Sequence, residues 1–220
     1  MKTLIIHPND VSTDFLKPIY AGIKSKTVVR KNVSQDKLTL LIQSHGTIIM
    51  LGHGASSGLF NVSGIGKGIM AVGDSMVKHL RGKQLIAVWC NADKFIKHHQ
   101  LDAMYSGMFI SEVSEAKYCG VEGNQAQVNE SNDTFAVLLG NMLGKVPTNL
   151  KEVYSMVGES YEELGEVNPI AKYNSERWYY NVKQKDTLAV DSVKTPTVGK
   201  TKNNLLTRFT NIIDKLLNKQ

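Results

Sequence analysis

The chain contains 220 residues, of which 42% are hydrophobic and 21% charged, and its formal net charge is +6 at pH 7. This length and apolar content suffice for a large domain with its own core, and they exclude a disordered or collagen-like chain. The basic residues are spread along the sequence instead of forming one block, so we expect no nucleic-acid partner.

The sequence predicts a cytoplasmic protein without a membrane partner. No stretch approaches the ~18 consecutive apolar residues of a membrane span, and the chain opens with a strand-like segment instead of a signal peptide. Cys90 and Cys119 are too few for a disulfide framework, so we interpret both as free thiols. No cofactor and no metal are predicted, and the oligomeric state is left open.

Short apolar runs alternate with helical patterns in the first half of the chain, as in successive βα units. The pattern predicts strands at 3–6, 27–30, 47–51, 84–89 and 107–111. Between and after them it predicts a helix at 14–23 that Pro18 shortens or kinks, a helix that Ser34 caps and that runs to residue 44, and helices at 74–80, 92–101 and 112–117. Residues 54–68 are rich in Gly and Ser and are predicted to form a mobile loop.

The second half is predominantly helical. Helices are predicted at 125–143 and 149–164, a late strand or packed loop at 168–182, and an amphipathic helix from residue 204. We therefore expect an α/β fold with a mostly parallel sheet, helices on both faces and a helical C-terminal part. The expected organisation is an α/β domain over 1–182, a linker or extended segment over 183–203 and a C-terminal amphipathic helix over 204–220.

Two of the predicted strands end at residues that can act together chemically. The apolar run 48–51 is followed by Gly52, His53 and Gly54, and the run 85–88 is followed by Trp89 and Cys90. Because the carboxyl ends of parallel strands meet at one edge of a sheet, a thiol and an imidazole should face each other there. A cysteine nucleophile with a histidine base is the chemistry that this pair predicts, with the imidazole lowering the pKa of the thiol. The alternatives are a buried structural cysteine and a loop histidine without a partner.

The same pattern resembles the caspase-like cysteine peptidases of clan CD, which include caspases, legumains, clostripain and gingipains. In that family, one apolar block followed by His-Gly and a second that ends one residue before Cys mark the catalytic dyad. The resemblance covers roughly residues 2–121 and implies a three-layer fold, with Cys90 as nucleophile and His53 as general base. It also implies that the backbone N–H groups of Gly54 and Cys90 form the oxyanion hole.

Substrate preference is predicted from acidic residues near the expected site. The family often reads a charged or amide side chain beside the cleaved bond, using residues after the first strand, near the cysteine and beyond the following strand. Those regions contain four carboxylates, which we take as candidate substrate-binding residues: Asp10, Asp93, Glu112 and Glu115. An acidic lining favours a peptide or protein substrate with Arg or Lys at the cleaved bond.

Two alternatives to an active peptidase remain open. One is a catalytically silent relative that acts as a binding or regulatory module. The other is a nucleotide- or metal-binding α/β domain whose strand ends gather His7, Asp10, His53 and Cys90 as ligands. His45-Gly46 repeats the His-Gly dipeptide, but it precedes its strand and should lie at the opposite edge of the sheet.

Overall fold

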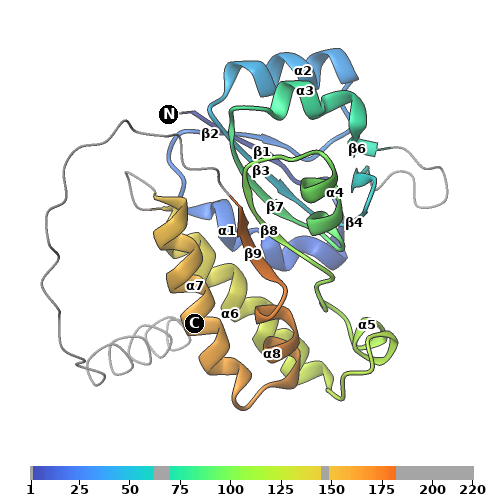
Figure 1. Ribbon diagram of the computed structural model, residues 1–220, viewed down its shortest axis with the longest axis vertical. Helices are drawn as coiled ribbons and strands as arrows, with labels where there is room; N and C mark the ends of the chain where they lie inside the picture. The colour runs from blue at the N-terminus through green and yellow to red at the C-terminus, as the bar shows by residue number, and fades with distance from the viewer. Residues whose placement is uncertain (1, 62–69, 145–148, 182–220) are drawn as a thin grey trace, which may run out of the picture. The chain divides into compact units, whose positions relative to one another are not determined.

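The central element of the fold is a six-stranded sheet (Figure 1). The computed structural model describes residues 2–61, 70–144 and 149–181, so the predicted linker and C-terminal helix lie outside the described residues. The strands run in the order β2 (Lys26–Val29), β1 (Thr3–Ile6), β3 (Thr47–Leu51), β7 (Gln84–Val88), β8 (Ala103–Ser106) and β9 (Trp178–Asn181). All neighbours are parallel except β8 and β9. The predicted mostly parallel sheet is confirmed.

Helices cover both faces of this sheet (Figure 1), which is why the inner strands are apolar throughout. Alternate residues of a strand point to opposite faces, so Leu4 and Ile6 belong to one buried cluster and Ile5 to another. The first cluster includes side chains of α2 (Gln35–Ser44), η3 (Asp74–Met76), α3 (Val77–Leu80) and α4 (Ala92–His98). The second includes side chains of η1 (Val11–Leu16), α1 (Pro18–Ala21), α6 (Gln125–Leu143) and α7 (Leu150–Gly165).

Side-chain caps explain why two helices begin where the sequence predicts. The Ser34 hydroxyl accepts a hydrogen bond of 3.3 Å from the backbone N–H of Lys37 at the start of α2. At the start of α6, Asn124 and Gln127 each accept a hydrogen bond from the other's backbone N–H, at 3.1 Å in both cases. These reciprocal bonds satisfy N–H groups that the first turn of a helix leaves without partners.

The predicted strand at 107–111 is wrong, because the fifth strand of the main sheet is β8, four residues earlier. Phe109 and Ile110 are buried although they lie outside the sheet. The Asn174 side chain accepts from the N–H of Ile110 at 2.7 Å and donates to its carbonyl at 2.9 Å. One amide side chain thus makes the two backbone hydrogen bonds that a neighbouring strand would otherwise make with Ile110.

Two further segments are more ordered than predicted. Part of the expected mobile loop forms an antiparallel hairpin of β4 (Gly54–Ala55) and β5 (Gly58–Phe60), to which β6 (Met70–Val72) pairs. Residues 62–68 of that predicted loop lie outside the described residues. The predicted late strand is β9, and it is preceded by a helix that the sequence pattern did not indicate, α8 (Pro169–Ser175). The helix predicted at 112–117 is present as α5 (Val113–Tyr118).

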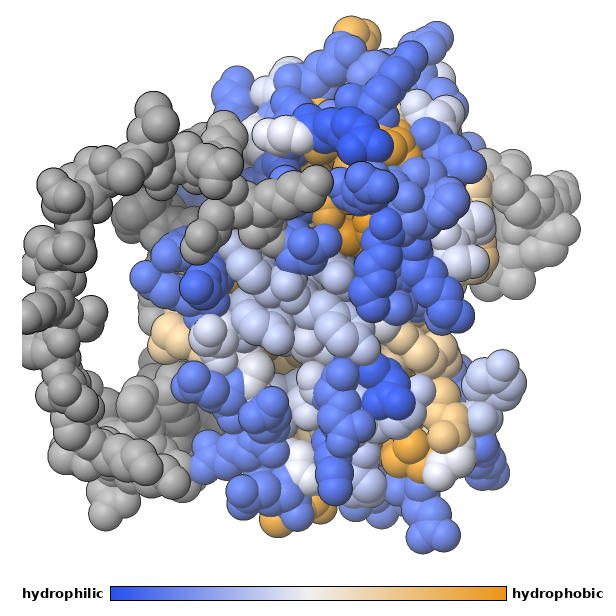
Figure 2. All heavy atoms as spheres, viewed as in Figure 1, coloured by the Kyte–Doolittle hydropathy of each residue, from blue (hydrophilic) through white to orange (hydrophobic). Residues whose placement is uncertain are grey.

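The surface of the described residues carries only scattered apolar side chains. Figure 2 shows one face that is predominantly hydrophilic, with hydrophobic side chains gathered in small separate groups. Val11, Tyr118 and Val167 are the most exposed large hydrophobic residues among those described, and they lie in different elements or loops. Among the described helices, none has the length and hydrophobicity needed to cross a membrane.

Candidate active site

The candidate site lies where β3 and β7 end at the carboxyl edge of the sheet. These two strands are direct neighbours, and Leu51 pairs with Val88 as their last partners. The ladder extends one step further, because the N–H of Gly52 donates to the carbonyl of Val88 at 3.1 Å. His53 and Cys90 each follow a paired residue by two positions, so both lie just beyond the same edge of the sheet.

The His53 ring turns toward the segment that follows β1. Its Nε2 lies 2.7 Å from the hydroxyl of Ser12, which itself lies 2.8 Å from Oδ1 of Asp10. The second carboxylate oxygen of Asp10 lies 3.7 Å from the same Nε2. Asp10, predicted as a substrate-binding residue, is thus placed against the candidate base. Sequence reasoning missed Ser12, because a lone serine after a strand has no distinguishing pattern.

The Cys90 thiol turns the other way, toward the segment that follows β8. Its Sγ lies 3.4 Å from the carbonyl oxygen of Phe109 and 3.8 Å from Oε1 of Glu115. Burial, and then the negative charge of Glu115, raise the pKa of Cys90 from an ordinary 9.0 to about 12. The expectation that the imidazole lowers this pKa is therefore wrong for this arrangement. In the part of the chain that the structure describes, no hydrogen bond joins His53 to Cys90.

Two backbone N–H groups in the strand endings bear on the expected oxyanion hole. Phe60 donates to the carbonyl of His53 at 2.8 Å, so Gly54 and Leu59 form the next, non-hydrogen-bonded pair of the hairpin. The N–H of Gly54 consequently points away from β5. Cys90 donates its backbone N–H to no acceptor within the described ranges. These are the two donors that the sequence resemblance implies for an oxyanion hole.

Gly54 is required because of its contact with Trp89. A Cβ at this position would overlap Cδ1 of the Trp89 indole and would lie 2.6 Å from the carbonyl oxygen of Gly58. Trp89 is almost fully buried, and its Nε1 donates to the carbonyl of Ala55 at 3.1 Å, so the indole cannot move freely. The hairpin after His53 is therefore packed directly on the residue before Cys90.

We expect Gly54→Ala to cost about 1–3 kcal/mol in the free energy of unfolding, because either the indole or the hairpin must shift. Any catalytic activity of Cys90 should fall with it, since the shift separates the two strand endings. Urea unfolding and activity assays would measure the two effects. Gly158→Ala in α7 is the matched control, because a Cβ there meets nothing within 4 Å and alanine favours a helix. A Gly54→Ala protein as stable as Gly158→Ala would contradict the packing argument.

The other predicted carboxylates differ in position. Asp93 forms an ion pair of 3.5 Å with Lys97 on the same helix, α4. Glu112 caps α5 and accepts from the Ser114 hydroxyl at 3.3 Å. Only Glu115 contacts the thiol, and its Oε2 is fixed by three hydrogen bonds, from the N–H and hydroxyl of Ser111 and from the N–H of Glu112. The structure thus brings Asp10 to His53 and Glu115 to Cys90, but neither Asp93 nor Glu112 joins them.

The geometry does not support the metal-binding alternative. His7 is fully buried, with Nδ1 3.1 Å from the Tyr20 hydroxyl and Nε2 3.1 Å from the Thr13 hydroxyl. Both ring nitrogens are therefore occupied. Within the described residues, no group of three His, Cys, Asp or Glu side chains is close enough to hold a metal ion.

The histidine of the second His-Gly dipeptide, His45, has partners outside the candidate site. It follows α2, and its ring nitrogens lie 2.8 Å from the Thr27 hydroxyl and 2.7 Å from the Leu41 carbonyl.

His7 should make stability depend on pH. Burial, and then the charge of Arg30, lower the pKa of His7 from 6.5 to about 4. Between these values the unfolded chain binds more protons than the native protein, so stability falls as pH falls. We expect His7 to contribute a loss of at most about 3 kcal/mol across this window. Urea unfolding at several pH values would measure it. His7→Gln should flatten the slope, whereas exposed His98→Gln should leave it unchanged.

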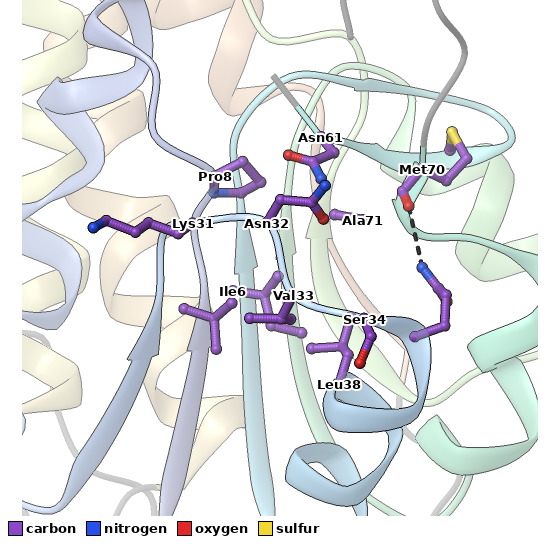
Figure 3. Close-up of a pocket in the computed structure, with 12 residues that line it drawn as sticks. Ile6, Pro8, Lys31, Asn32, Val33, Ser34, Leu38, Asn61, Met70 and Ala71 are labelled. Carbon is purple, nitrogen blue, oxygen red and sulfur yellow. Dashed lines mark hydrogen bonds between the residues drawn. The ribbon is translucent and has the colours of Figure 1, made fainter. Parts of the chain in front are cut away.

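A cavity of about 320 Å³ lies at the carboxyl ends of β1 and β2 (Figure 3). Ile6, Val33 and Leu38 line its apolar part, and Asn32 and Asn61 point toward each other on its polar side. The Gln35 side chain donates to the carbonyl of Met70 at 3.4 Å along one wall. Neither His53 nor Cys90 lines this cavity, so it is not the substrate pocket of the candidate dyad.

Comparison of the chain with family models, curated proteins and solved structures gives no match.

Proposed function

We propose that the chain is a cysteine endopeptidase in which Cys90 is the nucleophile and His53 the general base. The observation that supports this most strongly is the pairing of β3 with β7, because it delivers both residues two positions past Leu51 and Val88. The direct packing of Gly54 on Trp89 fixes the two endings relative to each other. A nucleophile and a base held at one sheet edge are the minimum requirement for covalent hydrolysis of an amide.

In the proposed reaction, the Cys90 side chain first rotates from the Phe109 carbonyl toward His53. Nδ1 of His53 then takes the thiol proton as Sγ forms a bond to the carbonyl carbon of the peptide. The negative oxygen of the tetrahedral intermediate accepts hydrogen bonds from the N–H groups of Gly54 and Cys90. The C–N bond then breaks, and His53 returns its proton to the leaving amine. Water, deprotonated by His53, hydrolyses the thioester and restores the thiol. The thiol enters this cycle in its neutral form, in keeping with its raised pKa.

We propose that the substrate carries Arg or Lys at the cleaved bond, and that Glu115 recognises it. Among the predicted substrate-binding carboxylates, only Glu115 touches the nucleophile. Its Oε2 is held by three donors, whereas Oε1 contacts the thiol and can accept from a guanidinium or ammonium group. A bound cation would also offset the charge that helps to raise the pKa of Cys90. Binding of the correct substrate would thereby make the thiol easier to deprotonate.

The proposed fold assignment is caspase-like. A mostly parallel sheet between two helical layers fits the three-layer arrangement that the sequence resemblance implies. The candidate histidine also follows one inner strand and the candidate cysteine the next, in the expected chain order. A peptide or protein is the proposed partner, and a cytoplasmic location remains a proposal.

A catalytically silent binding module is the second candidate function. The orientation of the two side chains favours it, because His53 contacts Ser12 on one side of the site and Cys90 contacts Glu115 on the other. A thiol with a pKa of about 12 is almost entirely protonated at neutral pH. In this alternative, the same surface would hold a basic peptide without cleaving it.

A peptide library with every amino acid at the cleaved position distinguishes the two candidates. It should be assayed under reducing conditions, with and without calcium, using the wild-type chain and a Cys119→Ala control. We expect cleavage after Arg and Lys by both proteins, because alanine keeps the backbone N–H with which Cys119 donates to the Glu115 carbonyl at 2.9 Å. Binding of basic peptides without hydrolysis would instead favour the silent module.

A further inference from the structure

In the segment after β1, Asp10 is hydrogen-bonded to Ser12, and Ser12 in turn contacts His53, the candidate base. Asp10 Oδ1 accepts from the Ser12 backbone N–H at 2.9 Å and lies 2.8 Å from the Ser12 hydroxyl oxygen. That hydroxyl lies 2.7 Å from Nε2 of His53. The side chains of His53 and Asp10 are 27% and 15% exposed, whereas Ser12 between them is exposed, so these contacts lie at the protein surface.

The donor and acceptor roles in this series of hydrogen bonds fix the position of one proton. An ionised carboxylate can only accept hydrogen bonds, so the single hydrogen of the Ser12 hydroxyl points to Asp10. The hydroxyl then presents a lone pair to His53, and Nε2 must carry a hydrogen. A neutral imidazole protonated at Nε2 has its lone pair at Nδ1, the nitrogen that remains to accept the thiol proton.

Hydrogen bonds of Thr13 and Asp10 fix the turn that contains Ser12. The Thr13 hydroxyl donates to the backbone carbonyl of Asp10 at 3.2 Å and lies 3.1 Å from the buried Nε2 of His7. Asp10 also caps η1 through its bond to the Ser12 N–H. A hydroxyl fixed by such a support can hold a ring in one orientation before substrate binds.

We infer that Ser12 and Asp10 are positioning residues, which keep His53 protonated at Nε2 and leave Nδ1 as the base. When Nδ1 takes the thiol proton, the ring becomes a cation, and Asp10 Oδ2 at 3.7 Å is then the nearest negative charge. This inference rests on the proposed function, in which His53 is the base. It differs from the expected role of Asp10 as a substrate-binding residue.

The state of the ring can be tested without any activity. Two-dimensional ¹H–¹⁵N NMR of the full chain, with His53→Ala to assign the signals, should show a neutral ring that carries its hydrogen on Nε2. Ser12→Ala should weaken that signal in favour of the form with the hydrogen on Nδ1, and Ser12→Thr, which keeps a hydroxyl, should restore it. Asp10→Asn should weaken it. A hydrogen on Nδ1 in the wild type, or an unchanged Nε2 signal in Ser12→Ala, would overturn the inference.

Kinetics provide the second readout. Ser12→Ala should lower kcat by about 10–100-fold and change KM by less than about threefold, because orientation of the base is lost while substrate contacts remain. Ser12→Thr should recover most of this loss. Ser75→Ala, in the exposed η3 turn, is the matched control and should be unchanged. An active wild type with an unaffected Ser12→Ala would overturn the positioning role alone. An inactive wild type that shows the Nε2 signal and its weakening in Ser12→Ala would refute only the proposed function.

Discussion

Cys90→Ala is expected to abolish peptide hydrolysis, lowering kcat by at least about 10⁴-fold, because it removes the sulfur that forms the thioester in the proposed reaction. The fold should persist. Alanine removes one sulfur atom from a site that is not fully buried, so the loss of stability should be no more than about 1–2 kcal/mol. Hydrolysis of the best library peptide and urea unfolding of the same samples would separate the chemical effect from the structural one.

The matched control for this substitution is Cys119→Ala. Cys119 is also a partly buried free cysteine, and it packs against the small cluster around Ile110. The same side chain is therefore removed from a position outside the site, and full activity is expected. Turnover by Cys90→Ala at the wild-type rate would refute a role for this thiol as nucleophile.

The strand endings could be predicted because strands buried on both faces are nearly all apolar. Residues 47–51 and 84–88 are such runs, and a reactive residue just after each of them is visible in the sequence. Their direct pairing could not be read from the sequence, since strand order depends on how the helices cross the sheet. Once β3 and β7 are neighbours, the equal spacing of His53 and Cys90 places both just beyond the same edge of the sheet.

The partners of the two site residues were harder to predict, because they depend on irregular segments. Ser12 reaches His53 only through the turn that Asp10 and Thr13 hold after β1. Glu115 was named as a candidate from its region of the chain, but its contact with Cys90 was not foreseen. The misplaced strand at 107–111 explains this, since α5 begins where the loop after β8 ends.

That misplaced strand shows how a polar side chain can override an apolar pattern. Phe109 and Ile110 have the composition of a strand, and both are buried. Asn174, distant in sequence, satisfies both backbone groups of Ile110, so the segment needs no strand neighbour. Such a contact leaves no periodic signal. The loop it stabilises nevertheless places the Phe109 carbonyl against the thiol.

Glu115→Gln is expected to have opposite effects on the reactivity of the thiol and on peptide cleavage. Removing the charge eliminates one cause of the raised pKa of Cys90, so this pKa should fall from about 12, although burial should keep it above 9.0. Alkylation by iodoacetamide at a fixed mildly alkaline pH should therefore accelerate several-fold. Cleavage after Arg or Lys should fall by about 10–100-fold, because the cation loses a charged partner.

The design of this variant keeps the local structure intact. Glutamine can replace glutamate in a capping box, so the side chain can still accept from the N–H groups at the start of α5. Glu112→Gln removes a neighbouring charge of the same sign whose side chain accepts from Ser114 and not from Cys90, and it should change neither rate by more than about twofold. Alkylation of Cys90 should be followed by mass spectrometry, which separates it from Cys119. If Glu115→Gln accelerates alkylation but leaves cleavage after Arg and Lys unchanged, Glu115 controls the thiol without recognising the substrate. If neither rate changes, the contact between Oε1 and Sγ has no part in the chemistry.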